Sequence, residues 1–304
     1  MGFSQEMKLY IITPSYNALP MLQRCVRSVA DQVMPGVLVH HHVQDGGSSD
    51  GTSTWLQWWQ SAHSSLPGYT FTYESARDSG MYDALNVAWS KIPADADITA
   101  HLNSDEQYLP NALKRVVEGA ERSPRADVLL ASYIVVDAKG EYVCHKRSIL
   151  PSSWISDVSC EISTCSCFHK VDAFVKHGVR FDTRYRSIAD MVMYRELVKL
   201  KLRFALLSDV FVSAFAMTGS NLAWGEATKR DMQIFLDAYP YAGTWFIRNV
   251  PYRYSALKRH IKDFLCSSPR SYQIYLNDDV ERTEITIKKP TTHWLSELPP
   301  TEKQ

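Results

Sequence analysis

Short apolar runs alternate with amphipathic stretches along the first half of the chain. The apolar runs are typical of buried strands, and hydrophobic residues recur at helical spacing in the stretches that follow them. The expected strands are 9–12, 37–43, 69–73, 98–102 and 128–136, and the expected helices are 19–29, 52–59, 80–89 and 112–117. Strands that alternate with helices predict an α/β fold with a mostly parallel sheet and right-handed crossovers.

Polar loops follow the predicted strands and carry most of the candidate chemistry. These loops are 13–17, 45–52, 74–80 and 103–106. In a parallel sheet they would lie outside the carboxyl ends of the strands, where α/β proteins bind their ligands. Their carboxylate, hydroxyl and amide groups can hydrogen-bond a base and a ribose, and can hold a phosphate through a cation. This combination fits a nucleotide-diphosphate sugar.

The adjacent carboxylates Asp105 and Glu106 follow the apolar segment 96–102, and Pro110 is well placed to open the next helix. Mg²⁺ and Mn²⁺ prefer oxygen ligands, and Mg²⁺ is commonly bound by one or two carboxylates together with substrate phosphates. For this pair alone, a solvated turn with a capping Asp is the simpler interpretation. The nucleotide-type loops around it favour a cation site.

Composition and missing motifs exclude several classes of protein. The 304 residues are 45% hydrophobic, so we expect a large core. The 33 Lys and Arg balance 33 Asp and Glu, and this net charge argues neither for nor against nucleic acid; no nucleic acid partner is expected. The absence of GxGxxG and GxxxxGK[ST] disfavours dinucleotide oxidoreductases and P-loop kinases. Six irregularly spaced cysteines, no signal peptide and no run long enough to span a membrane predict reduced thiols and a cytoplasmic location.

Four strings, each after a predicted strand, resemble glycosyltransferase family 2, the inverting enzymes with the glycosyltransferase-A fold. They are YIITPSYN at 10–17, QDGGSSDGT at 44–52, RDSGMYDALN at 77–86 and LNSDEQY at 102–108. Two later stretches, 179–197 and 214–221, are similar to the family's catalytic-base segment and its late loop. The resemblance is strongest to the branch that builds bacterial surface polysaccharides.

The resemblance implies a Rossmann-like sheet and a division of the chain. The catalytic domain would be 1–225, with a nucleotide-binding half at 7–107 and an acceptor-binding half at 108–225. A helical extension and tail would occupy 226–304.

The resemblance also implies a role for each matched position. Nucleotide contacts would come from Pro14, Ser15, Tyr16, Asp45, Asp78 and Ser104, sugar contacts from Asp83 and Asn103, a Mn²⁺ or Mg²⁺ ligand from Asp105, and the general base from Asp190. The implied reaction transfers a sugar, with inversion, from a nucleotide-diphosphate sugar to a hydroxyl of a saccharide or lipid-linked saccharide. UDP-sugars are the family's commonest donors.

Two departures from the family pattern keep other functions open. Asn103 replaces the first Asp of the Asp-x-Asp signature, and Ala189 precedes Asp190 where an acidic residue is usual. An inactive relative that scaffolds a polysaccharide assembly complex is one alternative. A sugar nucleotidyltransferase is another, although it should carry a Gly-rich, basic loop that 13–17 lacks.

Some of these residues also have structural interpretations. Asp45 and Asp50 could be turn and N-cap residues, because Asp-Gly and Ser-Asp-Gly sequences favour both. With the neighbouring strings, we favour ligand contact for Asp45 and capping for Asp50. Asp83 and Asn86 lie a turn apart and could form a solvated helix face. Asp190 could be an ordinary helix N-terminal Asp, although we favour the base.

The C-terminal part differs in character, because residues 245–265 interleave aromatic, basic and apolar side chains. Apolar residues of 257–265 are spaced for one helix face, with Lys258, Arg259 and Lys262 on other sides. Basic amphipathic helices lie in membrane interfaces. We therefore expect peripheral contact with the cytoplasmic face of the inner membrane, or else packing on the catalytic domain or a second subunit. Residues 270–304 are expected to form a tail or an extended arm.

Overall fold

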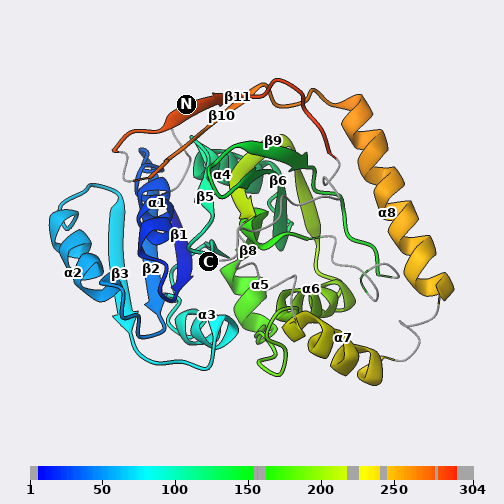
Figure 1. Cartoon of the computed structure of the whole chain (residues 1–304), viewed down its shortest axis with the longest axis horizontal. Helices are drawn as coiled ribbons and strands as arrows, with labels where there is room; N and C mark the ends of the chain where they lie inside the picture. Colours follow the sequence, from blue (N-terminus) through cyan, green and yellow to red (C-terminus); the bar gives the residue numbers. More distant parts are fainter. Residues whose placement is uncertain are drawn as a thin grey trace.

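The computed structural model describes residues 6–153, 156, 162–217, 226–239, 245–277 and 280–292. Within them, a nine-stranded sheet has the order β3-β2-β1-β4-β8-β6-β9-β5, with β7 paired to β6, and helices flank it (Figure 1). The loop expected at 214–221 lies partly outside the described residues, and residues 293–304 lie entirely outside them.

The N-terminal half of the sheet is parallel, as its sequence pattern predicts. It contains β1 (Met7–Ser15), β2 (Val37–Asp45), β3 (Tyr69–Ser75) and β4 (Ile98–His101). Because these strands run in the same direction, the loops that follow them meet at one edge of the sheet.

The second half of the sheet is mixed. It contains β5 (Gln107–Tyr108), β6 (Val128–Asp137), β7 (Tyr142–Lys146), β8 (Cys167–Lys170) and β9 (Phe204–Met217). The turn at 137–140 joins the antiparallel pair β6–β7. Strand β8 lies between β4 and β6 and is antiparallel to both, whereas β6 and β9 are parallel. Strands β5, β8 and β9 were not apparent in the hydrophobic pattern.

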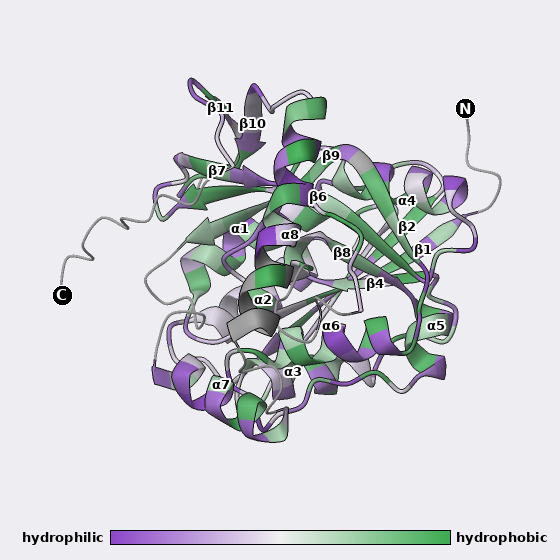
Figure 2. Ribbon diagram, turned by 90° about the vertical axis from the view of Figure 1, so that its right-hand side faces the viewer, coloured by the Kyte–Doolittle hydropathy of each residue, from purple (hydrophilic) through white to green (hydrophobic). Residues whose placement is uncertain are grey.

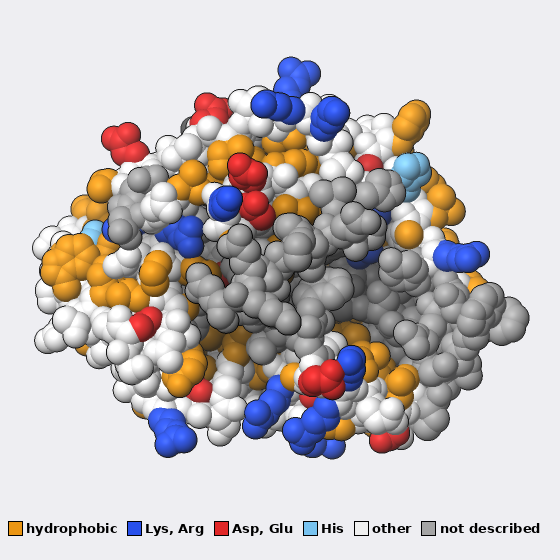
Figure 3. Space-filling view, viewed as in Figure 1, with side chains coloured by type: hydrophobic (Ala, Val, Ile, Leu, Met, Phe, Trp, Pro, Cys, Tyr) orange, Lys and Arg blue, Asp and Glu red, His pale blue; other side chains and the backbone are white. Residues whose placement is uncertain are grey.

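Two hydrophobic clusters cover the two faces of the sheet. One face carries α1 (Leu19–Ala30), α2 (Thr52–Ala62) and α4 (Ala112–Arg122); the other carries α3 (Met81–Trp89), α5 (Val171–Lys176), α6 (Ala189–Lys199) and α7 (Glu226–Ala238). Successive side chains of a strand point to opposite faces, so Leu9 and Ile11 join the first cluster while Tyr10 and Ile12 join the second. Hydrophobic side chains also gather on the surface over α2, where Trp58 is exposed (Figure 3).

The C-terminal part wraps around the sheet. Helix α8 (Trp245–Leu265) runs along one side of the molecule, and the hairpin of β10 (Ser271–Ile274) and β11 (Thr283–Thr286) crosses one end (Figure 1). Tyr272 and Ile274 pack in a third hydrophobic cluster with β6 and β9, and Arg282 forms an ion pair with Asp31. Through Ile287, the stretch after residue 270 is therefore a packed arm and not a loose tail.

Candidate active site

The ends of β1 and β2 lie side by side, with Ser15 in register with Asp45. Pro14 and Ser15 close β1, and the buried Ser15 Oγ has no hydrogen-bond partner among the described residues. Tyr16 follows and is 66% exposed. An exposed ring beside an unpartnered buried hydroxyl is consistent with the predicted base pocket.

Asp45 is fully buried at the end of β2. Its Oδ2 accepts hydrogen bonds from Ser48 N at 3.0 Å and from Ser75 Oγ at 2.5 Å, and its Oδ1 accepts one from Ser48 Oγ. The carboxylate therefore holds the 45–52 loop against the end of β3. Contact between Asp45 and a base or ribose remains a prediction.

Asp50 caps two helices. Its Oδ2 accepts a hydrogen bond from Leu19 N at 2.9 Å at the start of α1, and its Oδ1 accepts one from Thr52 N at 3.2 Å at the start of α2. The predicted capping role is confirmed. Asn17 Oδ1 accepts a hydrogen bond from Ser49 N at 2.8 Å, so the loops after β1 and β2 are bound to each other.

Asp78 lies against Gly46 in the 45–52 loop, which follows β2. A Cβ at Gly46 would lie 2.8 Å from Asp78 Oδ2 and 3.3 Å from Tyr16 Cδ2, so only glycine lets these groups approach. Burial raises the pKa of the Asp78 carboxyl, and the nearby charges of Asp83 and Asp45 act in the same direction. The loops after β1, β2 and β3 therefore converge.

Helix α3 contributes Asp83 and Asn86. Asp83 Oδ2 accepts a hydrogen bond from Ser79 N at 3.0 Å, which orders the loop ahead of the helix. Asn86 donates to Phe181 O and accepts from Phe181 N, both at 2.9 Å. The alternative of a solvated face is therefore wrong for Asn86, which joins α3 to the segment that leads into α6.

The turn after β4 separates its two acidic residues. Glu106 is fully buried, and its Oε2 accepts a hydrogen bond from Asn103 N at 2.7 Å. Burial, together with the charge of Asp105, raises the pKa of Glu106 to about 8. Ser104 and Asp105 are partly exposed at the tip of the turn. The paired carboxylates are therefore not equivalent, and only Asp105 faces outward.

Asp190 lies in the first turn of α6, beside this acidic turn. Tyr82 Oη donates a hydrogen bond to Asp190 Oδ1 at 3.2 Å, and Met191 N donates another at 2.9 Å. Burial raises the pKa of Asp190, and the Asp190 charge in turn contributes to the raised pKa of Glu106. Sequence reasoning missed Tyr82; its only signal was its place in the 77–86 string.

A metal ion at this turn would have few protein ligands. In the described part of the chain, no group of three or more His, Cys, Asp or Glu side chains could hold a metal ion. Asp105 is the outward carboxylate, and the buried Asn103 Oδ1 has no hydrogen-bond partner among the described residues. One carboxylate with substrate phosphates fits Mg²⁺ or Mn²⁺.

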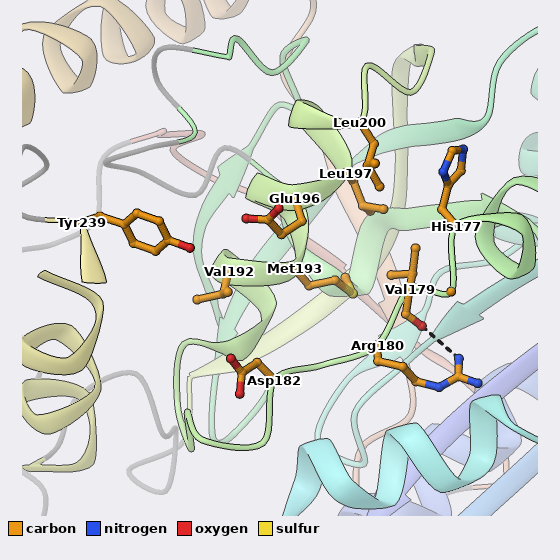
Figure 4. Close-up of a pocket in the computed structure, with 11 residues that line it drawn as sticks. His177, Val179, Arg180, Asp182, Val192, Met193, Glu196, Leu197, Leu200 and Tyr239 are labelled. Carbon is orange, nitrogen blue, oxygen red and sulfur yellow. Dashed lines mark hydrogen bonds between the residues drawn. The ribbon is translucent and has the colours of Figure 1, made fainter. Parts of the chain in front are cut away.

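A separate pocket of about 420 Å³ lies between α6, the 177–182 segment and the end of α7 (Figure 4). Its lining includes Arg180, Asp182, Glu196 and Tyr239. None of the residues predicted for the site lines it. This pocket is therefore distinct from the edge where the loops and Asp190 meet.

Solved structures share this fold. S. aureus TarS, in a structure with UDP-GlcNAc, has a TM-score of 0.57 at 18% identity over 84% of this chain and 73% of that one. A mannosyltransferase of Pyrobaculum calidifontis, with GDP-Man and Mn²⁺, has a TM-score of 0.58 at 14% identity over 88% and 77% of the two chains.

Sequence comparison gives the family. An uncharacterized glycosyltransferase of Mycobacterium tuberculosis is 34% identical over 109 residues, which span 36% of this chain and only 38% of that protein. The family model described as glycosyl transferase family 2 matches residues 10–179, more than half of the chain and all four strings that line the edge of the sheet. The chain belongs to glycosyltransferase family 2.

Proposed function

We propose that the chain is an inverting glycosyltransferase, which moves a sugar from a nucleotide-diphosphate sugar to a hydroxyl of a saccharide or lipid-linked saccharide. Family membership supports sugar transfer. The observation that best supports the mechanism is the placement of Asp190, hydrogen-bonded to Tyr82 and electrostatically coupled to the acidic turn after β4.

Asp190 would remove the proton from the acceptor hydroxyl while the acceptor oxygen attacks the anomeric carbon of the sugar. The bond from this carbon to the nucleoside diphosphate breaks on the opposite face, and the diphosphate leaves. Burial raises its pKa toward neutrality, which suits a general base better than the low pKa of an exposed carboxylate. The bond from Tyr82 fixes one carboxylate oxygen, so the other can face the acceptor. The two hydrogen bonds between the Asn86 side chain and the Phe181 backbone hold α3 against the segment that leads into α6.

The donor would bind where the loops after β1, β2 and β3 meet. Tyr16 and the buried Ser15 hydroxyl would contact the base, and Asp78 the base and ribose edge. Asp83 and Asn103 would contact the sugar, and Ser104 the diphosphate of the nucleotide. UDP-sugar is the first choice; TarS and the mannosyltransferase were solved with UDP-GlcNAc and GDP-Man respectively.

Asp105, on the outward tip of its turn, would hold Mn²⁺ or Mg²⁺. When bound, such a cation neutralises the charge that develops on a departing diphosphate. Glu106 is buried and bonded to Asn103 N, so it would shape the turn and not face the donor.

Replacement of Asp190 by Asn tests the proposal. We expect the Asp190→Asn variant to lose about a hundredfold or more in transfer rate, since it lacks a proton acceptor. Nucleotide binding should persist, because the donor loops are untouched. The measurements are release of nucleoside diphosphate and thermal shift with UDP, GDP, dTDP and CMP, each with and without Mn²⁺.

The matched control is Asp172→Asn, which alters an exposed Asp in the first turn of α5. It should transfer and bind as the wild type does. Normal transfer by Asp190→Asn would show that the base is wrongly assigned. A wild type that neither turns over nor binds any of these nucleotides would favour the scaffold alternative, which Asn103 and Ala189 leave open.

A further inference from the structure

Helix α8 packs on the body of the protein through its basic side. Lys258 Nζ donates a hydrogen bond to Leu150 O at 2.9 Å, and Lys262 Nζ donates one to Ser148 O at 2.8 Å. Asp263 pairs at 3.0 Å with Arg147, whose side chain is fully buried. These contacts use the polar residues that a surface helix ordinarily presents to water.

The opposite side of α8 is an exposed apolar stripe. From residue 250 to residue 264 its members recur at alternating intervals of four and three, and the last member lies four residues after Ile261, which keeps all of them on one face. The α8 stripe consists of Val250, Tyr254, Leu257, Ile261, Phe264 and Leu265. Phe264 is 87% exposed and Leu265 is 75% exposed. Figure 2 shows α8 as the outermost element on its side of the molecule, in front of the sheet.

A contiguous apolar surface of this kind marks an interaction site. The charge around the stripe indicates what it contacts. Arg253 and His260 are exposed beside it, and Arg270 is exposed just beyond the helix. The single carboxylate within α8 is Asp263, which Arg147 already pairs. The exposed charge that the described part of α8 contributes beside the stripe is therefore cationic, with no exposed α8 carboxylate to offset it. The carboxylate of Asp209 lies near the end of the helix and pairs with Arg147.

This charge pattern distinguishes between two possible partners of the stripe, a second copy of α8 and an anionic lipid surface. If two copies of α8 met through the stripe, their cations would face each other without an α8 carboxylate to form interhelical ion pairs, and like charges repel. An anionic lipid surface supplies both an apolar layer for the stripe and negative headgroups for Arg253 and Arg270.

We propose that the α8 stripe lies in the interface of an anionic lipid bilayer, with the helix parallel to the membrane plane. Among the described residues, no helix is both long enough and apolar enough to cross a bilayer. The inference goes beyond sugar transfer. It also corrects the expectation that the basic residues Lys258 and Lys262 contact the membrane, because both face the protein.

Vesicle flotation tests the proposal without any need for activity. We expect the full-length protein to float with phosphatidylcholine vesicles that contain phosphatidylglycerol, and much less with phosphatidylcholine alone. The double variant Ile261→Ser/Phe264→Ser should bind at least about tenfold more weakly, because two apolar side chains no longer enter the interface. Arg253→Glu should weaken binding by about fivefold or more and reduce its dependence on salt.

The matched control is Val175→Ser/Val280→Ser, which alters two exposed apolar residues away from α8. It should float as the wild type does, and circular dichroism should show that all variants are folded. The proposal is overturned if the wild type does not float or if the stripe variant floats equally well. It is also overturned if sedimentation shows a lipid-free dimer that the stripe variant abolishes while vesicle binding is unchanged.

Discussion

At the scale of single residues, Asp190 is subject to opposing influences on its pKa. Burial disfavours the charged carboxylate and raises the pKa, whereas the hydrogen bonds from Met191 N and Tyr82 Oη favour the charged form. The effect of burial dominates, so the pKa of Asp190 is raised. Tyr82 therefore acts on the proposed base in two ways: it orients one oxygen and limits how far the pKa rises.

The Tyr82→Phe variant should shift the acid limb of kcat/KM to higher pH. Loss of the phenol removes a hydrogen bond to the carboxylate, so the pKa of Asp190 rises further and the base becomes protonated at a higher pH. The ring and its contact with Phe181, at a centroid distance of 4.9 Å, remain. The measurement is a pH profile of kcat/KM for the wild type, Tyr82→Phe and the control Tyr73→Phe, which alters a partly buried tyrosine of β3. An unmoved acid limb would contradict this role for Tyr82.

At the scale of elements, α3 connects the two halves of the candidate site. Asp83 orders the loop that contains Asp78, Tyr82 bonds to Asp190, and Asn86 pairs with the backbone of Phe181. These residues lie within two turns of one helix, so a displacement of α3 would disturb the donor loops and the proposed base together.

The Asn86→Ala variant should reduce both stability and transfer. It leaves the N–H and C=O groups of Phe181 without their partners, and loss of partly buried hydrogen bonds costs about 1–3 kcal/mol. Urea denaturation measures the free energy of unfolding. Both kcat and the affinity for nucleotide should fall, because α3 orders the Asp78 loop as well as Asp190. The control is Gln57→Ala on the exposed side of α2. A variant as stable and as active as the wild type would exclude this linking role.

At the scale of the whole molecule, several histidines are buried in their neutral form. Burial lowers the pKa of His42, His101 and His145 to about 4, and that of His41 and His169 to about 3. In the unfolded chain a histidine has a pKa of about 6.5. As the pH falls below that value, the unfolded state takes up protons that the folded state does not, and folding becomes less favourable. The carboxyl groups whose pKa is raised act in the opposite direction but are fewer; they are Asp78, Glu106, Asp190 and Asp263.

Stability should therefore fall between about pH 6.5 and pH 4. The His169→Phe variant should show a shallower fall, because it removes one buried group that cannot accept a proton in the folded state. Its ring would remain among Phe174 and Tyr194. The free energy of unfolding, measured across this pH range, should show no such change in slope for the control His177→Phe, which alters an exposed histidine. Parallel curves for His169→Phe and the wild type would refute the explanation.

The sequence alone determined the parallel half of the sheet, the loops at its edge and the family. Each of these is local: an apolar run, the loop after it and the next helix are contiguous, and each family string lies within one such unit. The capping role of Asp50 was predictable for the same reason. Strand alternation, a local property, also explains why His41 contacts Thr13 and Tyr69 whereas His40 and His42 contact Thr72.

Only the tertiary structure decided how distant segments meet. It placed β8 between β4 and β6, brought Tyr82 to Asp190 and Asn86 to Phe181, and buried Glu106 while Asp105 stayed outward. It also turned the basic side of α8 inward, because the carbonyl groups of Leu150 and Ser148 accept hydrogen bonds from its lysines there. Arg147 pairs with Asp263 on the same side. These outcomes depend on packing between residues far apart in the chain, and a local pattern of apolar and polar positions carries no information about such contacts.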